Sequence, residues 1–260
     1  MRRLITVFML SCTLSLIGPA VSVAQDATPT AGPTVLPLDE PAYGATYAEW
    51  SARYFEWFLS FPLAVNPATD ATGERCGYGQ SGPVFFLAGG MPTPFAVGGT
   101  PPAGAPIPMR SCTIPADTPL LLHLFGANCS TVEPPPFFGR DEAELRACAK
   151  ALMDLPAVLT ATVDGQVVPD LTRYRVQSPL FRVTLPADNW LGVPPATTEA
   201  VADGYWLLLA PLPPGEHDIR FGGYLPDVGI GAESAYQLTV AEPTVMPPAS
   251  GTPAAATPAA

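Results

Sequence analysis

Aromatic residues recur at helical spacing near the start of the apolar part of the chain. They follow one another at intervals of 4, 3, 4, 3 and 4 positions, which is the period of one helix face. We therefore expect an amphipathic helix over residues 43–61 that packs this stripe against a core. Phe55 and Phe58 fall off the stripe, so they are candidates for stacking a ligand such as a sugar. The stripe consists of Tyr43, Tyr47, Trp50, Tyr54, Trp57 and Phe61.

Short apolar runs separated by turn residues dominate the rest of the sequence. Asp164-Gly165 lies between two such runs and is a strong hairpin signal. Asp141 and Glu144 form a variant of the capping box and predict one further short helix. The pattern favours an antiparallel β-sandwich, immunoglobulin-like or jelly-roll-like. The predicted strands begin at Pro83 and continue with Arg110–Ile114, Pro119–Phe125, Ala157–Val163, Gln166–Pro169, Arg173–Gln177, Leu180–Leu185, Tyr205–Ala210, His217–Gly222 and Ala235–Val240.

The first 24 residues have the pattern of an export signal. Arg2 and Arg3 precede an apolar run, and small residues lead to a cleavage site after Ala24. The run is too short to span a bilayer, and no later run reaches that length. We expect a secreted or cell-envelope protein. Lipidation of Cys12 is an alternative, which the apolar residues after Cys12 disfavour.

Two segments rich in Pro, Thr and Ala flank the folded part. Residues 25–38 and 242–260 contain little to bury and cannot offset the entropy of ordering. We predict a disordered linker and a disordered tail around a single domain, residues 39–241.

The negative net charge of the chain disfavours two classes of binding partner. The chain carries 12 basic and 23 acidic residues, and signal cleavage would leave 10 against 23, a net charge of −13. Such a surface repels nucleic-acid phosphates and anionic lipid, so we expect neither as a partner. Hydrophobic residues make up 48 % of the chain, which is enough to form a core.

The predicted domain contains four cysteines, and export would expose them to oxidation. Four cysteines allow three pairings. We favour Cys76 with Cys112 and Cys129 with Cys148, because each bond would close a local excursion of the chain. The four cysteines could instead bind zinc, but the sequence has no C-x-x-C pair.

Gly77, Gly79 and Gly82 have the spacing of a dinucleotide-binding loop. Such a loop follows a strand and opens a helix. Here a cysteine precedes the glycines and a strand-like run follows them. We interpret the segment as a tight turn and expect no nucleotide cofactor.

Candidate catalytic groups are few. His123 lies in an apolar run and His217 at a strand start, and each is more typical of a structural role. A glycosidase needs two carboxylates and no histidine, and Asp70, Glu74 and Asp203 are the candidate acids. Asp70 and Glu74 share a turn-rich loop whose oxygens could hold calcium, the one metal left open.

Three segments resemble a family of secreted bacterial proteins to which no activity is assigned. The family pattern has an EWSA-type aromatic helix and a C-x-x-GQSGPV(W/F)FLAG segment. Trp is commoner in the family where this chain has Tyr54, Phe55 and Phe85. The resemblance implies a single domain and no catalytic residues. The segments are EWSARYFEWFLSFPLAVNPATDATGERCGYGQSGPVFFLAGG from residue 49, RSCTIPADTPLL from residue 110 and DGYWLLLAPLPPGEHDIRFGG from residue 203.

These observations predict a secreted, non-catalytic binding or cell-envelope module whose ligand the sequence does not identify. The partner could be an envelope glycan or a protein. The alternative is a secreted hydrolase that acts on polysaccharide through paired carboxylates.

Overall fold

The computed structural model describes residues 32–94 and 107–243, and these described residues belong to one compact unit. The predicted signal peptide with Cys12, the first part of the predicted linker and nearly all of the predicted tail lie outside the described residues. No helix among the described residues combines the length and the apolar character needed to cross a bilayer.

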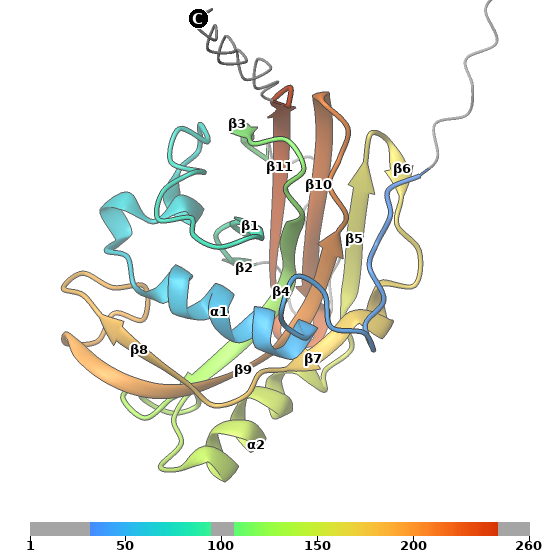
Figure 1. Cartoon of the computed structure of the whole chain (residues 1–260). Coiled ribbons are helices and arrows are strands. Elements are labelled where there is room, and N and C mark those ends of the chain that lie inside the picture. Colours follow the sequence, from blue (N-terminus) through green and yellow to red (C-terminus); the bar gives the residue numbers. More distant parts are fainter. Residues whose placement is uncertain (1–31, 95–106, 244–260) are drawn as a thin grey trace, which may run out of the picture. The chain divides into compact units, whose positions relative to one another are not determined.

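Two β-sheets make up most of this unit (Figure 1). In the first sheet the strand order is β1-β4-β9-β7, and β8 pairs with the part of β9 that β7 leaves free. β4 and β9 form its long antiparallel centre. The strands are β1 (Phe85–Leu87), β4 (Leu120–Ser130), β7 (Arg175–Gln177), β8 (Phe181–Leu185) and β9 (Ala196–Leu209).

The second sheet has the order β2-β11-β10-β5-β6, and β3 also pairs with β11. The predicted Asp164-Gly165 hairpin joins β5 to β6, and both turn residues have the positive φ that this turn type requires. The strands are β2 (Thr93–Pro94), β3 (Met109–Ile114), β5 (Val158–Val163), β6 (Gln166–Val167), β10 (Gly215–Leu225) and β11 (Ile230–Val240).

The prediction of a mainly β fold with two helices is confirmed, but the prediction of purely antiparallel pairing is wrong. β1 runs parallel to β4, and β3 runs parallel to β11. The reason is the long connections in the chain, because a parallel pair needs a long crossover that a hairpin cannot supply. Short one-turn helices fill some of the connections: η1 (Leu63–Val65), η2 (Pro67–Thr69), η3 (Leu171–Tyr174) and η4 (Pro226–Val228).

The two sheets meet where β4 packs against β5, β10 and β11. Gly223 of β10 lies at a close approach of the two sheets, since a Cβ at this residue would lie 2.5 Å from Cβ of Phe125 on β4. A larger residue at 223 would push the sheets apart, so the sequence uses glycine there.

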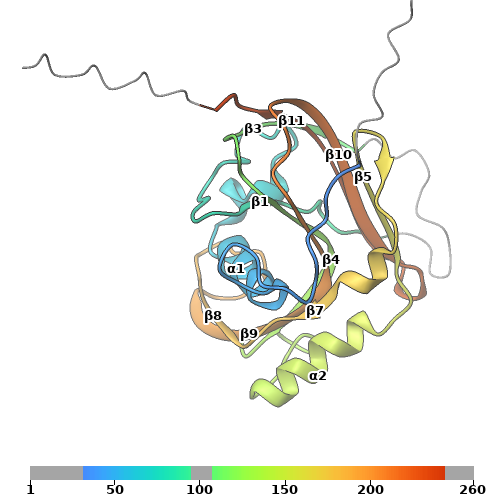
Figure 2. The ribbon, with the colours of Figure 1, turned by 45° about the vertical axis from the view of Figure 1, so that its right-hand side comes forward.

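Helix α1 (Tyr47–Leu59) begins at a capping box. The backbone N–H of Thr46 donates to Oε2 of Glu49 at 2.8 Å, and the Glu49 N–H donates to Oγ1 of Thr46 at 3.2 Å. The helix is shorter than predicted at both ends, with its N-cap at Thr46 and its C-cap at Ser60, so Tyr43 and Phe61 of the aromatic stripe lie outside it. α1 packs against β7, β8 and β9 (Figure 2).

Helix α2 (Glu142–Met153) packs against β4 and β9, on the side of β9 opposite to α1 in both views (Figures 1 and 2). The carboxylate of Asp141 caps it and accepts a 3.0 Å hydrogen bond from the N–H of Glu144. The Cys129–Cys148 disulfide joins α2 to β4.

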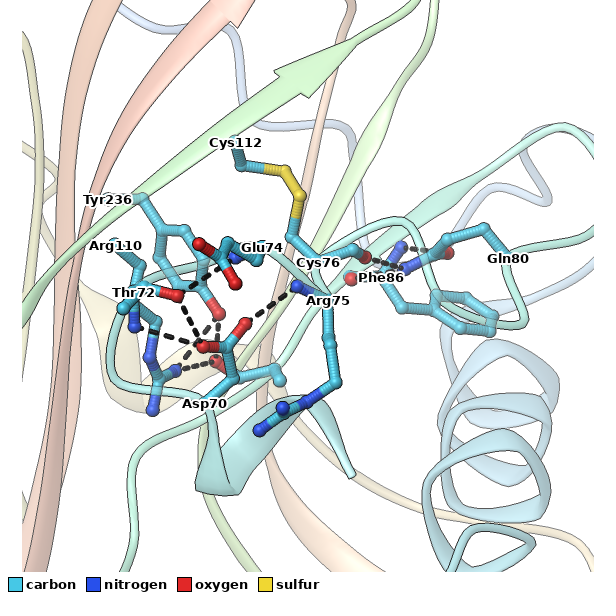
Figure 3. The surroundings of a disulfide bond; sticks show 11 residues. Asp70, Thr72, Glu74, Arg75, Cys76, Gln80, Phe86, Arg110, Cys112 and Tyr236 are labelled. Atoms are coloured by element: carbon cyan, nitrogen blue, oxygen red, sulfur yellow. Dashed lines mark hydrogen bonds between the residues drawn. A yellow bond between two sulfur atoms is a disulfide. The ribbon is translucent and has the colours of Figure 1, made fainter. Parts of the chain in front are cut away.

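The other disulfide, Cys76–Cys112, joins the loop before β1 to β3 (Figure 3). The Cα atoms are 5.9 Å apart in this bond and 6.1 Å apart in Cys129–Cys148, within the usual range. These are the two pairs that the sequence analysis favoured.

Several boundaries differ from the sequence prediction: β4 ends at Ser130 rather than at Phe125, and β11 begins at Ile230 rather than at Ala235. β9 begins at Ala196 rather than at Tyr205, because Gly204 continues the strand opposite Gly126 of β4 instead of forming a turn. The predicted disordered linker, residues 25–38, extends too far at its C-terminal end, because Val35 already forms a bridge with Leu209 of β9. Apolar residues near that end pack against the core and so give it the contacts that hold it in place: Val35, Leu36 and Leu38.

Candidate ligand-binding pocket

A pocket of about 360 Å³ lies beside the second half of β4. Its walls come from the end of β4, the loop before α2, the last turn of α2, the loop after β8 and the turn between β10 and β11. Most of the lining is apolar, as is usual for sites that bind small molecules. The wall residues are Pro92, Phe125, Gly126, Ala127, Asn128, Glu133, Pro134, Phe137, Leu152, Met153, Trp190, Leu191, Leu225, Val228 and Ile230.

The apolar wall of this pocket includes both exposed and buried residues. Phe137 and Val228 belong to the wall and are 38 % and 45 % exposed. Met153, at the end of α2, is by contrast fully enclosed. The apolar lining therefore extends from exposed side chains to an enclosed one.

Trp190 is presented by a loop that a buried asparagine shapes. The Asn189 side chain donates to the carbonyl oxygens of Pro186 at 2.9 Å and Val193 at 2.7 Å, and its oxygen accepts from the Leu191 N–H at 3.1 Å. The indole of Trp190 packs edge-on against Phe58 of α1, with ring centroids 4.6 Å apart. Because both the loop and the ring are held, the wall is formed before any ligand enters.

Glu133 is the one acidic residue of the described wall, and it is buried. Nδ2 of Asn128 donates to Oε2 of Glu133 at 3.2 Å. Burial raises the pKa of Glu133 from 4.5 to about 7, and a hydrogen bond from Ser130 opposes this shift only in part. No Arg, Lys or His is among the described wall residues, so no cation compensates this carboxyl.

The loop that carries Glu133 is tied to β4 at its two ends. The Ser130 N–H donates to the carbonyl of Phe137 at 3.0 Å, and the Gly139 N–H donates to the carbonyl of Ser130 at 3.3 Å. The N–H of Glu133 itself donates to Oγ of Ser130 at 3.2 Å. Ser130 thus fixes both the loop and the backbone position of its acid.

A smaller cavity of about 80 Å³ lies behind the pocket and shares part of its wall. Tyr54, Phe55 and Phe58 of α1 and His123 of β4 close the inner side. The shared residues are Pro92, Phe125, Gly126, Asn128 and Trp190.

His123 is half-buried, but its Nε2 atom is enclosed and has no hydrogen-bond partner among the described residues. Its ring stacks on Trp206 with centroids 4.4 Å apart and lies 5.2 Å from Tyr54 and 5.3 Å from Phe55. This burial lowers the pKa of His123 to about 3, so the imidazole is neutral at physiological pH. Because Nε2 has no hydrogen-bond partner among the described residues, His123 lacks there the hydrogen-bonded contact on this nitrogen that a catalytic triad requires.

The prediction that Phe55 and Phe58 form an exposed stacking platform is wrong. They are 4 % and 6 % exposed, because α1 is covered on more than its striped face. Phe55 stacks on Phe181 of β8 with centroids 6.4 Å apart, and Phe58 packs on Trp190. Both rings line the inner cavity instead of the surface.

The three candidate acids have separate structural contacts. Asp203 on β9 is buried, and its carboxylate accepts from Arg175 at 2.7 and 3.0 Å. Asp70 is also buried and follows η2, whereas Glu74 is exposed (Figure 3). Among the described residues, no hydrogen bond joins Asp203 to Asp70 or Glu74, and the guanidinium of Arg175 neutralises its charge.

The Asp70 carboxylate holds its own loop together. Its oxygens accept from the Thr72 N–H at 3.0 Å, the Thr72 hydroxyl at 2.8 Å and the Arg75 N–H at 2.7 Å (Figure 3). Although burial opposes ionisation, these hydrogen bonds hold the pKa of Asp70 at about 2. Within the described residues, no three His, Cys, Asp or Glu side chains gather as a metal site would require.

His217 and the glycine loop both have structural roles. Nδ1 of His217 lies 2.7 Å from Oδ2 of Asp164, and Nε2 lies 2.8 Å from the carbonyl oxygen of Pro213, so the ring links two turns.

In the glycine loop, the amide of Gln80 donates to the Phe86 carbonyl at 2.8 Å and accepts from the Phe86 N–H at 3.0 Å (Figure 3). The loop leads into β1 and not into a helix, as the turn interpretation expects.

Sequence patterns did not indicate Glu133, Asn128 or Trp190 as site residues. Glu133 lies in the run TVEPPPFF, an acid among apolar residues, which is a weak signal for a buried carboxyl. Asn128 and Trp190 show no local pattern, since their roles depend on loops that meet only in the folded chain.

Comparisons with known proteins return no match. No protein-family model matches the chain. No curated protein and no solved structure matches it either.

Proposed function

We propose that this protein is a secreted binding protein that holds a small, mainly apolar molecule in the pocket beside β4. The observation that carries the proposal is the combination of a preformed apolar pocket of about 360 Å³ with a single buried carboxyl in its wall. Pockets with this composition, a few polar groups in an apolar lining, are the usual form of small-molecule sites. A buried group with a strongly shifted pKa supports the same assignment.

The chemistry of the wall favours binding over catalysis. Glycoside hydrolysis needs two carboxylates that converge on one bond. The wall supplies one, Glu133, and the contacts of Asp70 and Asp203 give no support to the polysaccharide hydrolase.

Export, the sandwich type and the family resemblance belong to the same proposal. The two disulfides are consistent with an oxidising compartment outside the cytoplasm. We keep cleavage after Ala24, an immunoglobulin-like or jelly-roll-like sandwich, and kinship with the secreted family as predictions. Attachment to the cell envelope through a glycan or a protein is a further prediction.

The test uses the full chain with its disulfides formed and the neutral fluorescent probe N-phenyl-1-naphthylamine. Phe137→Ala removes an aromatic wall residue, and Phe138→Ala is its matched control, because Phe138 is equally exposed at 40 % but does not line the pocket. We expect saturable binding with one site per chain, weakened at least fivefold by Phe137→Ala and less than twofold by Phe138→Ala. Absence of saturable binding, or equal effects of the two variants, would overturn the proposal.

A further inference from the structure

We propose that the pocket selects organic cations, meaning a quaternary or protonated ammonium group carried on an apolar body. This inference rests on the proposed function and adds the chemical class of the ligand. Its basis is the placement of one carboxyl and three aromatic rings around the same apolar space: Glu133 with Phe125, Phe137 and Trp190.

The described wall of the pocket contains one acidic residue and no basic residue. Glu133 has a neutral partner, the amide of Asn128, which donates to one of its oxygens at 3.2 Å. A buried carboxylate without a cation is costly. A ligand that brings a positive charge removes that cost, whereas an anionic ligand adds repulsion.

The aromatic rings of the wall, Phe125, Phe137 and Trp190, can also attract a cation. Ammonium groups that are weakly hydrated are attracted to the faces of Trp and Phe rings, and aromatic cages use this attraction to recognise quaternary ammonium compounds. The chain already shows this preference internally, since the guanidinium of Arg53 lies 4.6 Å from the ring centroid of Trp50.

Neighbouring charges favour the same class of ligand. His123, the basic residue of the inner cavity, is neutral. Asp188 and Asp227, in the connections that reach the wall, are exposed acids, and Glu233 of β11 is a third nearby acid. The full chain has a net charge of −11, which attracts cations at long range. Five basic side chains on the surrounding elements are paired with a carboxylate: Arg140 with Glu144, Arg146 with Glu142, Lys150 with Asp154, Arg175 with Asp203 and Arg220 with Asp218.

The experiment compares two probes of nearly equal shape, choline and its neutral carbon analogue 3,3-dimethylbutan-1-ol, by calorimetry on the full chain at pH 8. We expect choline to bind at least tenfold more tightly. Glu133→Gln should weaken choline at least tenfold and change the neutral analogue less than twofold. Glu199→Gln is the control, because it removes the same charge from an exposed residue of β9 that is not part of the wall.

A second measurement does not depend on any variant. At pH 6.5 part of the Glu133 population is protonated, since its pKa is about 7, so choline binding must release protons into the buffer. Titrations in buffers of different ionisation enthalpy measure that release. Equal affinities for the two probes, or choline binding without proton release, would overturn the inference and leave the proposed function standing. If the neutral probe N-phenyl-1-naphthylamine also fails to bind, the proposed function fails with it.

Discussion

Nδ2 of Asn128 on β4 donates a 3.2 Å hydrogen bond to Oε2 of Glu133, the single acid in the described wall of the pocket. This contact orients the carboxyl without neutralising it. An amide in place of an arginine leaves Glu133 able to change its charge when a ligand or a proton arrives.

Replacing Glu133 should change how stability depends on pH. Its pKa is raised from 4.5 to about 7 by burial, so the folded chain binds the proton more tightly than the unfolded chain. The contribution of Glu133 is therefore fully present below pH 4.5 and is lost as the pH rises to about 7, a change of about 3 kcal/mol at most. Glu133→Gln should remove this loss of stability. Urea unfolding of the wild type and the variant at pH 4.5 and pH 8 would measure the difference. An identical pH dependence in wild type and variant would contradict the buried position of Glu133.

Gly126 should tolerate no side chain. A Cβ at this position would lie 2.6 Å from Nε2 of His123 and 2.9 Å from the carbonyl oxygen of Asp203. Gly126→Ala should lower the free energy of unfolding by about 1–3 kcal/mol, as overpacked cores do. Gly77→Ala is the control, because nothing lies within 4 Å of a Cβ there, and its effect should stay within about 0.5 kcal/mol. Equal effects of the two substitutions would refute the close contact.

Loss of the Cys129–Cys148 bond should disturb the pocket, because the bond holds α2 against β4. It closes a loop with a sequence separation of 19 residues, and the chain-entropy model gives it about 3 kcal/mol. The double variant Cys129→Ala with Cys148→Ala should lose that stability and weaken probe binding. Removal of Cys76 and Cys112 should cost stability with a smaller effect on the probe. Non-reducing peptide mapping must find both bonds, and crossed pairs would contradict the fold.

Phe58 should behave as a core residue. It is buried against Trp190, so Phe58→Ala should cost about 3–5 kcal/mol of unfolding free energy. Tyr43 is the matched aromatic control from the predicted stripe, since it is 41 % exposed, and Tyr43→Ala should cost much less. Comparable losses for the two variants would indicate that α1 is less covered than the structure shows.

Local patterns predicted the elements of this fold better than their assembly. The aromatic spacing located α1, and Asp141 with Glu144 located α2 within a residue of its start. Spacing could not show that Phe55 and Phe58 are also buried, because the covering comes from Phe181 and Trp190, far along the chain.

Local sequence patterns could not predict the pocket either, because residues from separate parts of the chain form its wall. Glu133, Asn128 and Trp190 come from a loop, a strand and another loop, and only the tertiary structure brings them to one wall. The parallel pairing of β3 with β11 is equally non-local, since its register depends on segments more than a hundred residues apart. Disulfide pairing was easier to predict, because both bonds close short loops.

The most direct test of the binding pocket is methyl NMR of the full chain labelled at methionine, titrated with N-phenyl-1-naphthylamine. Met153 is enclosed in the pocket wall, whereas Met109 is 39 % exposed on β3 and is not part of that wall. The account predicts a saturable shift of the Met153 methyl resonance and no shift of Met109. Saturable binding that leaves Met153 unchanged would contradict it.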